Sequence, residues 1–133
     1  MDKIKVGIIG LGGVGSIIKR AFWEHHATEV VALCDQNPAI LGSHIDSANK
    51  VAAYTDYRLL LEREQVDLLY LAVPPKYHHG IALDILKSGK HLLCEKPLAN
   101  SLKEAEEMLE TAVGAGVVHA IISRHITVQP IKN

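Results

Sequence analysis

Short apolar runs of strand length recur along the chain, and segments with helical periodicity separate them. These runs are residues 4–10, 29–35, 50–54, 66–74, 91–95 and 116–123. Within each run the apolar residues are nearly continuous rather than alternating, as is typical of parallel strands that helices cover on both faces. The alternation of strand and helix from end to end therefore predicts an α/β fold with a doubly wound parallel sheet.

The periodicity of the intervening segments predicts where the helices lie. A weaker helix should follow Pro38 and end near Asn49, and Ser88-Gly89 should close the helix before the fifth strand. The capping box Ser101-x-x-Glu104 should start the last helix. The first helix should bury one stripe, made of Val14, Ile17, Ile18, Ala21 and Phe22.

The composition is that of one soluble domain. The chain has 133 residues, of which 48% are hydrophobic and 22% charged, and its formal net charge is −1. That charge gives no reason to expect nucleic acid or an anionic membrane as a partner. No apolar stretch approaches the roughly 18–20 residues of a membrane helix. We therefore expect a cytoplasmic protein.

The two cysteines and the histidines suggest neither a disulfide nor a metal site. Cys34 and Cys94 each end an apolar run and would lie on strands two and five. Three strand spacings of about 4.8 Å would separate them, which is too far for a disulfide. Because the chain contains neither Cys-x-x-Cys nor His-x-x-x-His, we expect no metal.

A glycine-rich segment, GLGGVG, directly follows the first apolar run and opens a helical segment. In its G-x-G-x-x-G spacing, Gly10 permits a tight turn, Gly12 lets the backbone approach a diphosphate, and Gly15 lets the helix pack close to the strand. The helix N-terminus offers unpaired N–H groups and a partial positive charge to phosphates. The residues that we expect to bind them are Gly10, Leu11, Gly12, Gly13, Val14 and Gly15.

An acidic residue, Asp35, ends the second apolar run, twenty residues after Gly15. Its carboxylate can accept hydrogen bonds from both hydroxyls of an adenosine ribose. A 2′-phosphate would meet that carboxylate, and no Arg or Lys follows in DQNPA to neutralise it. This pattern favours NAD over NADP. Rossmann modules for SAM, FAD and CoA share parts of the layout, so the loop alone does not fix the nucleotide.

Four stretches resemble one known family, and GKHLLCEKPLANS is the most specific of them. The other three are VGIIGLGGVGS, the YTDY of residues 54–57 and LAVPPKYHHGIAL. They resemble the N-terminal domain of the glucose–fructose oxidoreductase, inositol dehydrogenase and MocA (Gfo/Idh/MocA) oxidoreductases, over essentially the whole chain. The resemblance implies a Rossmann domain with three αβα layers and the strand order 3-2-1-4-5-6, whose ligand crevice lies at the carboxyl ends of the strands.

The resemblance also implies roles for residues after the fourth and fifth strands. Val73 and Pro74 match positions that line the cofactor, and His78 matches a histidine at the start of the following helix. Glu95 and Lys96 match residues beside the nicotinamide ribose, where the lysine helps to orient or polarise the substrate. The catalytic candidates are therefore Lys96 and His78, and all five residues are cofactor-binding candidates.

Each of these candidates has a simpler interpretation. Pro97 pushes Lys96 toward an extended conformation, but Glu95 and Lys96 could instead form a solvated ion pair that closes a buried strand. His78 could be an ordinary helix-start histidine. The helical spacing does not choose between His78 and His79.

The family pattern implies a second domain, absent from this chain, that supplies the substrate walls and a catalytic histidine. We expect residues 1–123 to form the NAD(P)-binding domain and residues 124–133 to begin the connection to that second domain. Without the second domain, the apolar surface on which it would dock is expected to be exposed. Such a surface would favour a homo-oligomer.

The expected function is that of the NAD-binding domain of an oxidoreductase. The whole enzyme would move a hydride between nicotinamide and a sugar, polyol or related alcohol, and its small-molecule substrate would bind through the second domain. The chain alone should bind NAD without turnover, because positioning walls and a proton-transfer group are missing. The alternatives are a non-catalytic NAD sensor or regulatory module, and a Rossmann domain for another nucleotide.

Overall fold

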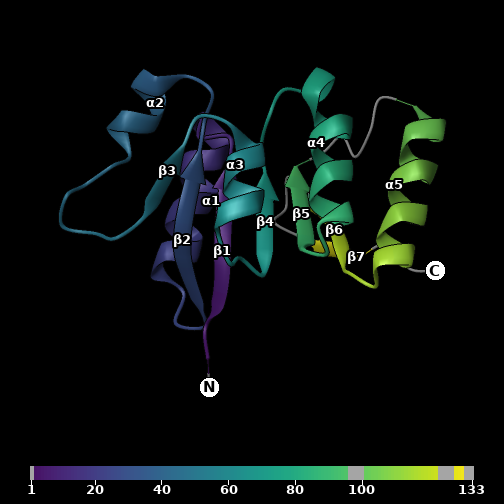
Figure 1. The fold of residues 1–133 in the computed structure, drawn as a ribbon, viewed down its shortest axis with the longest axis horizontal. Helices are drawn as coiled ribbons and strands as arrows, with labels where there is room; N and C mark the ends of the chain where they lie inside the picture. Colours follow the sequence, from purple (N-terminus) through teal and green to yellow (C-terminus); the bar gives the residue numbers. More distant parts are fainter. Residues whose placement is uncertain (1, 96–100, 123–127, 131–133) are drawn as a thin grey trace.

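The sheet has the strand order that the sequence predicts. The computed structural model describes residues 2–95, 101–122 and 128–130 (Figure 1). Within them, parallel strands follow one another in the order β3-β2-β1-β4-β5-β6. The strands are β1 (Ile4–Ile9), β2 (Thr28–Cys34), β3 (Ala52–Tyr54), β4 (Leu68–Leu71), β5 (His91–Glu95) and β6 (His119–Ile122). The chain is therefore a doubly wound α/β domain of the Rossmann type.

A further strand, β7 (Val128–Pro130), pairs antiparallel with β6. It lies within the segment 124–133, which the sequence analysis assigned to an interdomain connection. The strand escaped sequence analysis because it is short and contains a proline, which cannot donate to a strand ladder. At the end of the strand order, next to β6 alone, a proline is tolerated.

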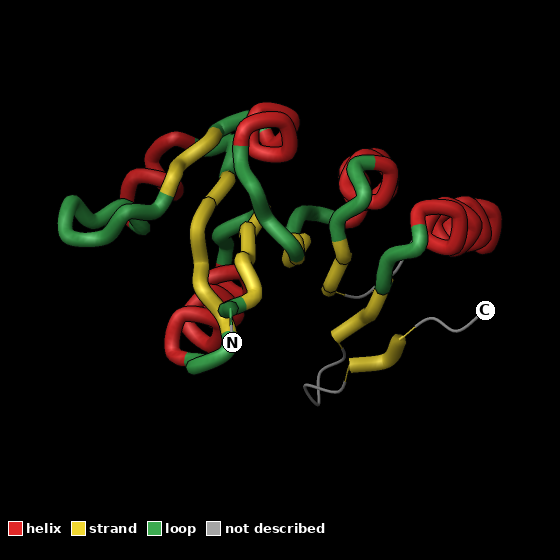
Figure 2. Tube along the Cα trace, turned by 60° about the horizontal axis from the view of Figure 1, so that its bottom comes forward, coloured by secondary structure: helices red, strands yellow, loops and turns green. Residues whose placement is uncertain are grey.

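Helices cover both faces of the sheet. Figure 2 shows α1 on the opposite side of the sheet from α3, α4 and α5. In the described part of the chain, none of these helices has the length and apolar character needed to span a membrane. They are α1 (Gly13–Glu24), α2 (Pro38–Ser43), α3 (Tyr57–Arg63), α4 (Pro75–Lys87) and α5 (Leu102–Ala115).

Two apolar clusters, one on each face, fix the helices to the sheet. The larger cluster joins strand residues such as Leu69 and Leu92 to Leu60 of α3, Ile85 of α4 and Met108 of α5. The smaller cluster contains Val6, Ile8, Val30 and Tyr70, with Ile18 and Phe22 of α1 packed against it. Because the central strands are buried from both sides, their carboxyl ends form a rigid edge from which loops emerge.

The buried stripe that the sequence analysis assigned to α1 is wrong in part. Ile18 and Phe22 pack against the sheet, but Val14 is 48% and Ile17 69% exposed, and Ala21 is exposed as well. The contact is centred on the buried Gly15, which lies three residues before Ile18. Apolar periodicity identified the helix correctly but could not show that a glycine is the contact point, since glycine has no apolar side chain.

The second helix is shorter than the sequence predicts, because it ends at Ser43 rather than near Asn49. The N–H of His44 donates to the Leu41 carbonyl, and the N–H of Ile45 donates to the Gly42 carbonyl. Such i→i+3 bonds tighten the last turn and end the α-helical pattern.

Other predicted helix ends are confirmed. The Oγ of Ser101 accepts the N–H of Glu104 at 3.2 Å, as expected of a capping box. Ser88 caps α4, and Gly89 has a φ of 79°. Helix α3 begins with the N-cap Asp56, whose side chain accepts the N–H of Arg58.

Candidate functional site

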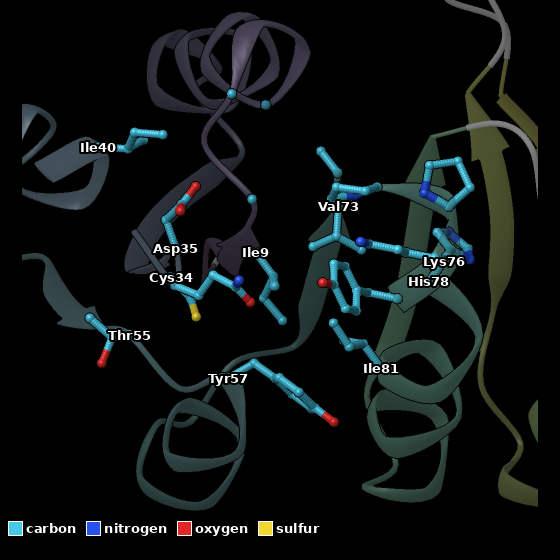
Figure 3. Close-up of a pocket in the computed structure, with 18 of the residues that line it drawn as sticks. Ile9, Cys34, Asp35, Ile40, Thr55, Tyr57, Val73, Lys76, His78 and Ile81 are labelled. Carbon is cyan, nitrogen blue, oxygen red and sulfur yellow. The ribbon is translucent and has the colours of Figure 1, made fainter. Parts of the chain in front are cut away.

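A cavity of about 1010 Å³ lies at the carboxyl ends of the central strands (Figure 3). Most of its lining comes from four segments at the carboxyl ends of strands, and Ile9 of β1, Ile40 of α2 and Gly80 and Ile81 of α4 complete it. The four segments lie within residues 10–15 for β1, 34–36 for β2, 55–58 for β3 and 72–78 for β4. Ligands of open α/β sheets bind at this edge, near the point where the strand order reverses between β1 and β4.

The glycines of the β1–α1 loop make a backbone cradle on one wall of the cavity. Gly10 has a φ of 98°, and a Cβ there would collide with the backbone of Ala72. A Cβ at Gly15 would collide with the carbonyl oxygen of Gly10. Nothing lies within 4 Å of the place where a Cβ of Gly12 would be. Packing against neighbouring backbone therefore requires glycine at positions 10 and 15, whereas glycine at position 12 leaves the adjacent part of the cavity open.

The N-terminus of α1 faces that open space. Gly12 is the N-cap, and the first intrahelical hydrogen bond runs from the Ser16 N–H to the Gly12 carbonyl at 2.9 Å. The N–H groups of Gly13, Val14 and Gly15 precede it and have no partner within the helix. Amides without a helical partner and the helix dipole together suit a diphosphate group. The loop therefore has the geometry to bind the diphosphate of NAD, the cofactor that the sequence analysis predicts.

Asp35 lies directly after β2 and is held by two backbone amides. Its Oδ2 accepts the N–H of Leu11 at 2.9 Å, and its Oδ1 accepts the N–H of Asn37 at 2.9 Å. The carboxylate thus links the glycine loop to the start of α2, and Figure 3 shows it at the cavity wall. Each carboxylate oxygen can accept more than one hydrogen bond, so capacity for ribose hydroxyls remains.

The segment after β3 adds aromatic and cationic lining that the sequence analysis did not assign. The Tyr57 hydroxyl donates to Asp84, and the Arg58 guanidinium lies 5.1 Å from the centre of the Tyr57 ring. Burial, with a contribution from Asp84, raises the pKa of Tyr57 to about 12. Burial beside Asp35 raises the pKa of the Cys34 thiol to about 12. Both groups therefore stay protonated at neutral pH and do not act as bases or nucleophiles.

The segment after β4 begins α4 and brings three further candidates to the cavity. Val73 and the N-cap Pro74 line it, and His78, only 3% exposed, lies in the first turn of α4. Lys76 also lines the cavity, with its Nζ 4.9 Å from the centre of the Tyr77 ring. The sequence analysis did not single out Lys76, although its place next to Pro75 at a helix start marked it for the same edge.

The two adjacent histidines of α4 have different surroundings. His78 lines the cavity, whereas His79 faces α5, with its Nε2 2.6 Å from Glu107 and its Nδ1 3.8 Å from Glu104. The structure therefore brings only His78 to the candidate site. Helical spacing alone could not decide this, because it did not indicate where α5 packs.

A second buried histidine, His119 of β6, lies close to His78. Its Nε2 is 3.4 Å from the Cys94 Sγ, and its side chain is almost fully buried. Burial, together with the nearby His78, lowers the pKa of His119 to about 4. The imidazole is therefore neutral at physiological pH.

The charged pair after β5 falls largely outside the described residues. Glu95 is the last residue of β5, and its backbone pairs with Ile122 of β6. The side chain of Glu95, and Lys96 and Pro97 altogether, lie outside the described part of the chain. Their expected place beside the nicotinamide remains a prediction.

A family model decides what kind of domain this is. The model for the oxidoreductase family with an NAD-binding Rossmann fold, named GFO_IDH_MocA, matches residues 4–123. The chain belongs to this family.

The individual relatives are larger proteins. A glycosyl hydrolase family 109 protein from Shewanella sp. (strain MR-4) is 34% identical over 121 residues, which are 84% of this chain and 26% of that protein. The WlbA dehydrogenase from Bordetella pertussis, solved with NADH and UDP-GlcNAcA, has a TM-score of 0.84 and 27% identity, over 90% of this chain and 37% of its own. A 3-ketoreductase from Actinomadura kijaniata, solved with TDP-benzene and NADP, has a TM-score of 0.82 and 26% identity, over 90% of this chain and 38% of its own.

Replacing single glycines of this NAD-binding family member should separate packing from ligand binding. Gly15→Ala should lower the free energy of unfolding by about 2 kcal/mol or more, because its Cβ collides with backbone. Gly12→Ala should fold with nearly unchanged stability but lose NAD affinity, because its Cβ enters the space meant for the diphosphate. Gly114→Ala on α5, which also has open space, is the control. Urea unfolding and calorimetric NAD titration would measure both quantities, and equal stability losses at Gly15 and Gly12 would contradict the packing argument.

The buried neutral state of His119 predicts a loss of stability in acid. Its pKa is about 6.5 when unfolded and about 4 when folded, so the unfolded chain binds more protons between these values. The free energy of unfolding should therefore fall as the pH drops from about 6.5 to 4, by up to about 3 kcal/mol from this group. Urea titrations at several pH values should show a smaller decrease for His119→Gln, and the original decrease for His26→Gln at an exposed position. Identical pH profiles for His119→Gln and the unchanged protein would contradict this account.

Proposed function

We propose that the cavity binds NAD and that the chain is the cofactor domain of an oxidoreductase acting on a sugar, polyol or related alcohol. The observation that carries the proposal is the glycine cradle placed next to Asp35 at one edge of the sheet. The diphosphate lies against the N-terminus of α1, and the adenosine ribose donates to Asp35. The nicotinamide then lies toward Val73 and His78 on the far side of the switch point.

The substrate-handling residues follow from that orientation. NAD supplies the acceptor or donor of the hydride, while the chain orients the reacting alcohol and its proton. Lys96, which directly follows β5, donates a hydrogen bond that orients and polarises the substrate oxygen. Glu95 and His78 hold the nicotinamide side of the site, with His78 fixed by its burial in the first turn of α4.

The walls around the substrate are proposed to come from a second domain. The chain spans about a quarter of the length of the curated relatives it matches and just over a third of the solved ones. The cavity lies at the carboxyl edge of the sheet, and its lining comes from the strand ends and from the loops and helices that follow them. Residues 1–133 alone therefore bind NAD but do not turn over a substrate, because the substrate is not confined against the nicotinamide.

Glycoside cleavage is a second candidate for the complete protein, because the curated relative at 34% identity is a glycosyl hydrolase family 109 protein. Some glycosidases depend on NAD rather than on a pair of carboxylic acids. The acids in the described cavity lining, Asp35 and Asp56, accept hydrogen bonds from backbone amides. Because these bonds give both side chains a structural role, a reaction that depends on NAD fits the cavity better than one that needs a pair of catalytic carboxylic acids.

Binding titrations test the cofactor assignment. Calorimetry should show NAD binding more tightly than NADP by roughly 10-fold or more, because a 2′-phosphate repels the Asp35 carboxylate. SAM and CoA should not compete. Asp35→Asn should weaken the binding of NAD and reduce the ratio of the affinities for NAD and NADP. The control Glu106→Gln, at an exposed position, should change neither quantity. Tighter binding of NADP, SAM or CoA than of NAD would contradict the proposal.

Product assays test the need for further walls. The 133-residue chain should form no NADH from NAD and a panel of polyols, and should release no p-nitrophenol from p-nitrophenyl glycosides in the presence of NAD. Substrate-dependent NADH would show a complete dehydrogenase site within this chain. Release of p-nitrophenol without accumulating NADH would instead show a complete glycosidase site. Either product would refute the proposal that the substrate walls come from elsewhere.

A further inference from the structure

A hydrogen-bonded bridge joins α1, the glycine loop and the end of α2 on the outside of the cavity. The Ser16 Oγ lies 2.8 Å from the Leu11 carbonyl and 3.3 Å from the His44 Nε2, and the Lys19 Nζ lies 2.9 Å from the His44 Nδ1. None of Ser16, Lys19 and His44 lines the cavity. The bridge nevertheless ends on the residue whose N–H holds the Asp35 carboxylate.

The hydrogen positions of this bridge follow from its members. A carbonyl oxygen can only accept, so Ser16 gives its hydroxyl hydrogen to Leu11. The remaining Ser16 lone pairs accept, so the Nε2 of His44 carries a hydrogen. An ammonium can only donate, so the Nδ1 of His44 accepts from Lys19. These assignments, inferred from the network, fit only the neutral imidazole with its hydrogen on Nε2.

The same bridge fixes the short helix at the adenosine end of the cavity. Helix α2 starts after Asn37, whose N–H donates to Asp35, and His44 is its C-cap. Between these two anchors lies Ile40, which lines the cavity (Figure 3). The position of Ile40 and the orientation of the Asp35 carboxylate therefore both depend on contacts at the two ends of α2.

We propose that Ser16, Lys19 and His44 are positioning residues for the cofactor, which preorganise the glycine loop, Asp35 and α2 for the adenosine diphosphate half of NAD. They act through Leu11 and Ile40 rather than by touching the ligand. Binding to a preorganised site avoids the cost of ordering it, so loss of the bridge weakens the cofactor without removing a contact to it. This inference rests on the proposed binding of NAD.

The bridge also makes cofactor binding sensitive to pH. A protonated His44 would turn an N–H toward the Lys19 ammonium and lose the hydrogen bond at Nδ1. The charged groups that face His44 are Lys19 from α1 and Asp35 from the end of β2, with opposite effects. Burial and Lys19 lower the pKa of His44 below its ordinary value of 6.5, so the bridge is intact at neutral pH and lost in acid.

Titration with ADP-ribose at a series of pH values from 7.5 downward tests the proposal, because this ligand contains the adenosine diphosphate half and lacks nicotinamide. The unchanged chain should bind more weakly as the pH falls through the lowered pKa of His44. His44→Ala and Ser16→Ala should weaken binding roughly 3- to 10-fold at pH 7.5, as expected for the loss of one or two hydrogen bonds. His44→Gln should restore most of the affinity and abolish most of the pH dependence, because its amide both donates and accepts without titrating.

The controls separate this bridge from other histidines and from the cofactor assignment. His26→Gln, at an exposed position, should keep the original affinity and pH dependence. If His44→Gln keeps the original pH dependence, or if His44→Ala and Ser16→Ala bind as tightly as the unchanged chain, the positioning role is wrong while NAD binding stands. If the unchanged chain binds neither ADP-ribose nor NAD, both the proposed function and this inference fail.

Discussion

The close approach of α1 to the end of β1 is the contact on which the rest of the site depends. Gly15 lies against the carbonyl of Gly10, and Gly10 lies against the backbone of Ala72, with no room for a Cβ at either glycine. This contact aims the N-terminus of α1 at the gap between β1 and β4. Because interiors are close-packed, a larger residue would move the helix and with it every amide that faces the cavity.

Electrostatics at this edge come from backbone amides, from Asp35 and from the charged lining residues Asp56, Arg58 and Lys76. Tyr57 and Cys34 beside the cavity have raised pKa values, and the buried His119 of β6 has a lowered pKa. All three side chains are therefore neutral at pH 7. The Asp35 carboxylate accepts hydrogen bonds from the backbone amides of Leu11 and Asn37. The site therefore offers helix amides to phosphates and a carboxylate to hydroxyls, which is the combination that NAD requires.

The sequence predicts the parts of this arrangement that depend on local spacing. Apolar runs give the strands, the glycine spacing gives the loop, and Asp35 follows from its place at the end of the second run. The glycine motif pointed to Gly15 as the place where the helix approaches the strand, but apolar periodicity wrongly added Val14 and Ile17 to the buried stripe, because it does not count glycine. The sequence could not reveal the bridge through His44, since residues 16, 19 and 44 meet only once α2 packs beside α1.

The central claim is that NAD binds along the glycine loop and Asp35, and amide NMR tests it most directly. Titration of the ¹⁵N-labelled chain with NAD should shift the amide signals of Gly12, Gly13 and Val14 and those of Leu11 and Asn37, which donate to Asp35. Amides of α5, such as that of Gly114, should stay in place. Saturable shifts confined to another surface, or no shifts at millimolar NAD, would contradict the account.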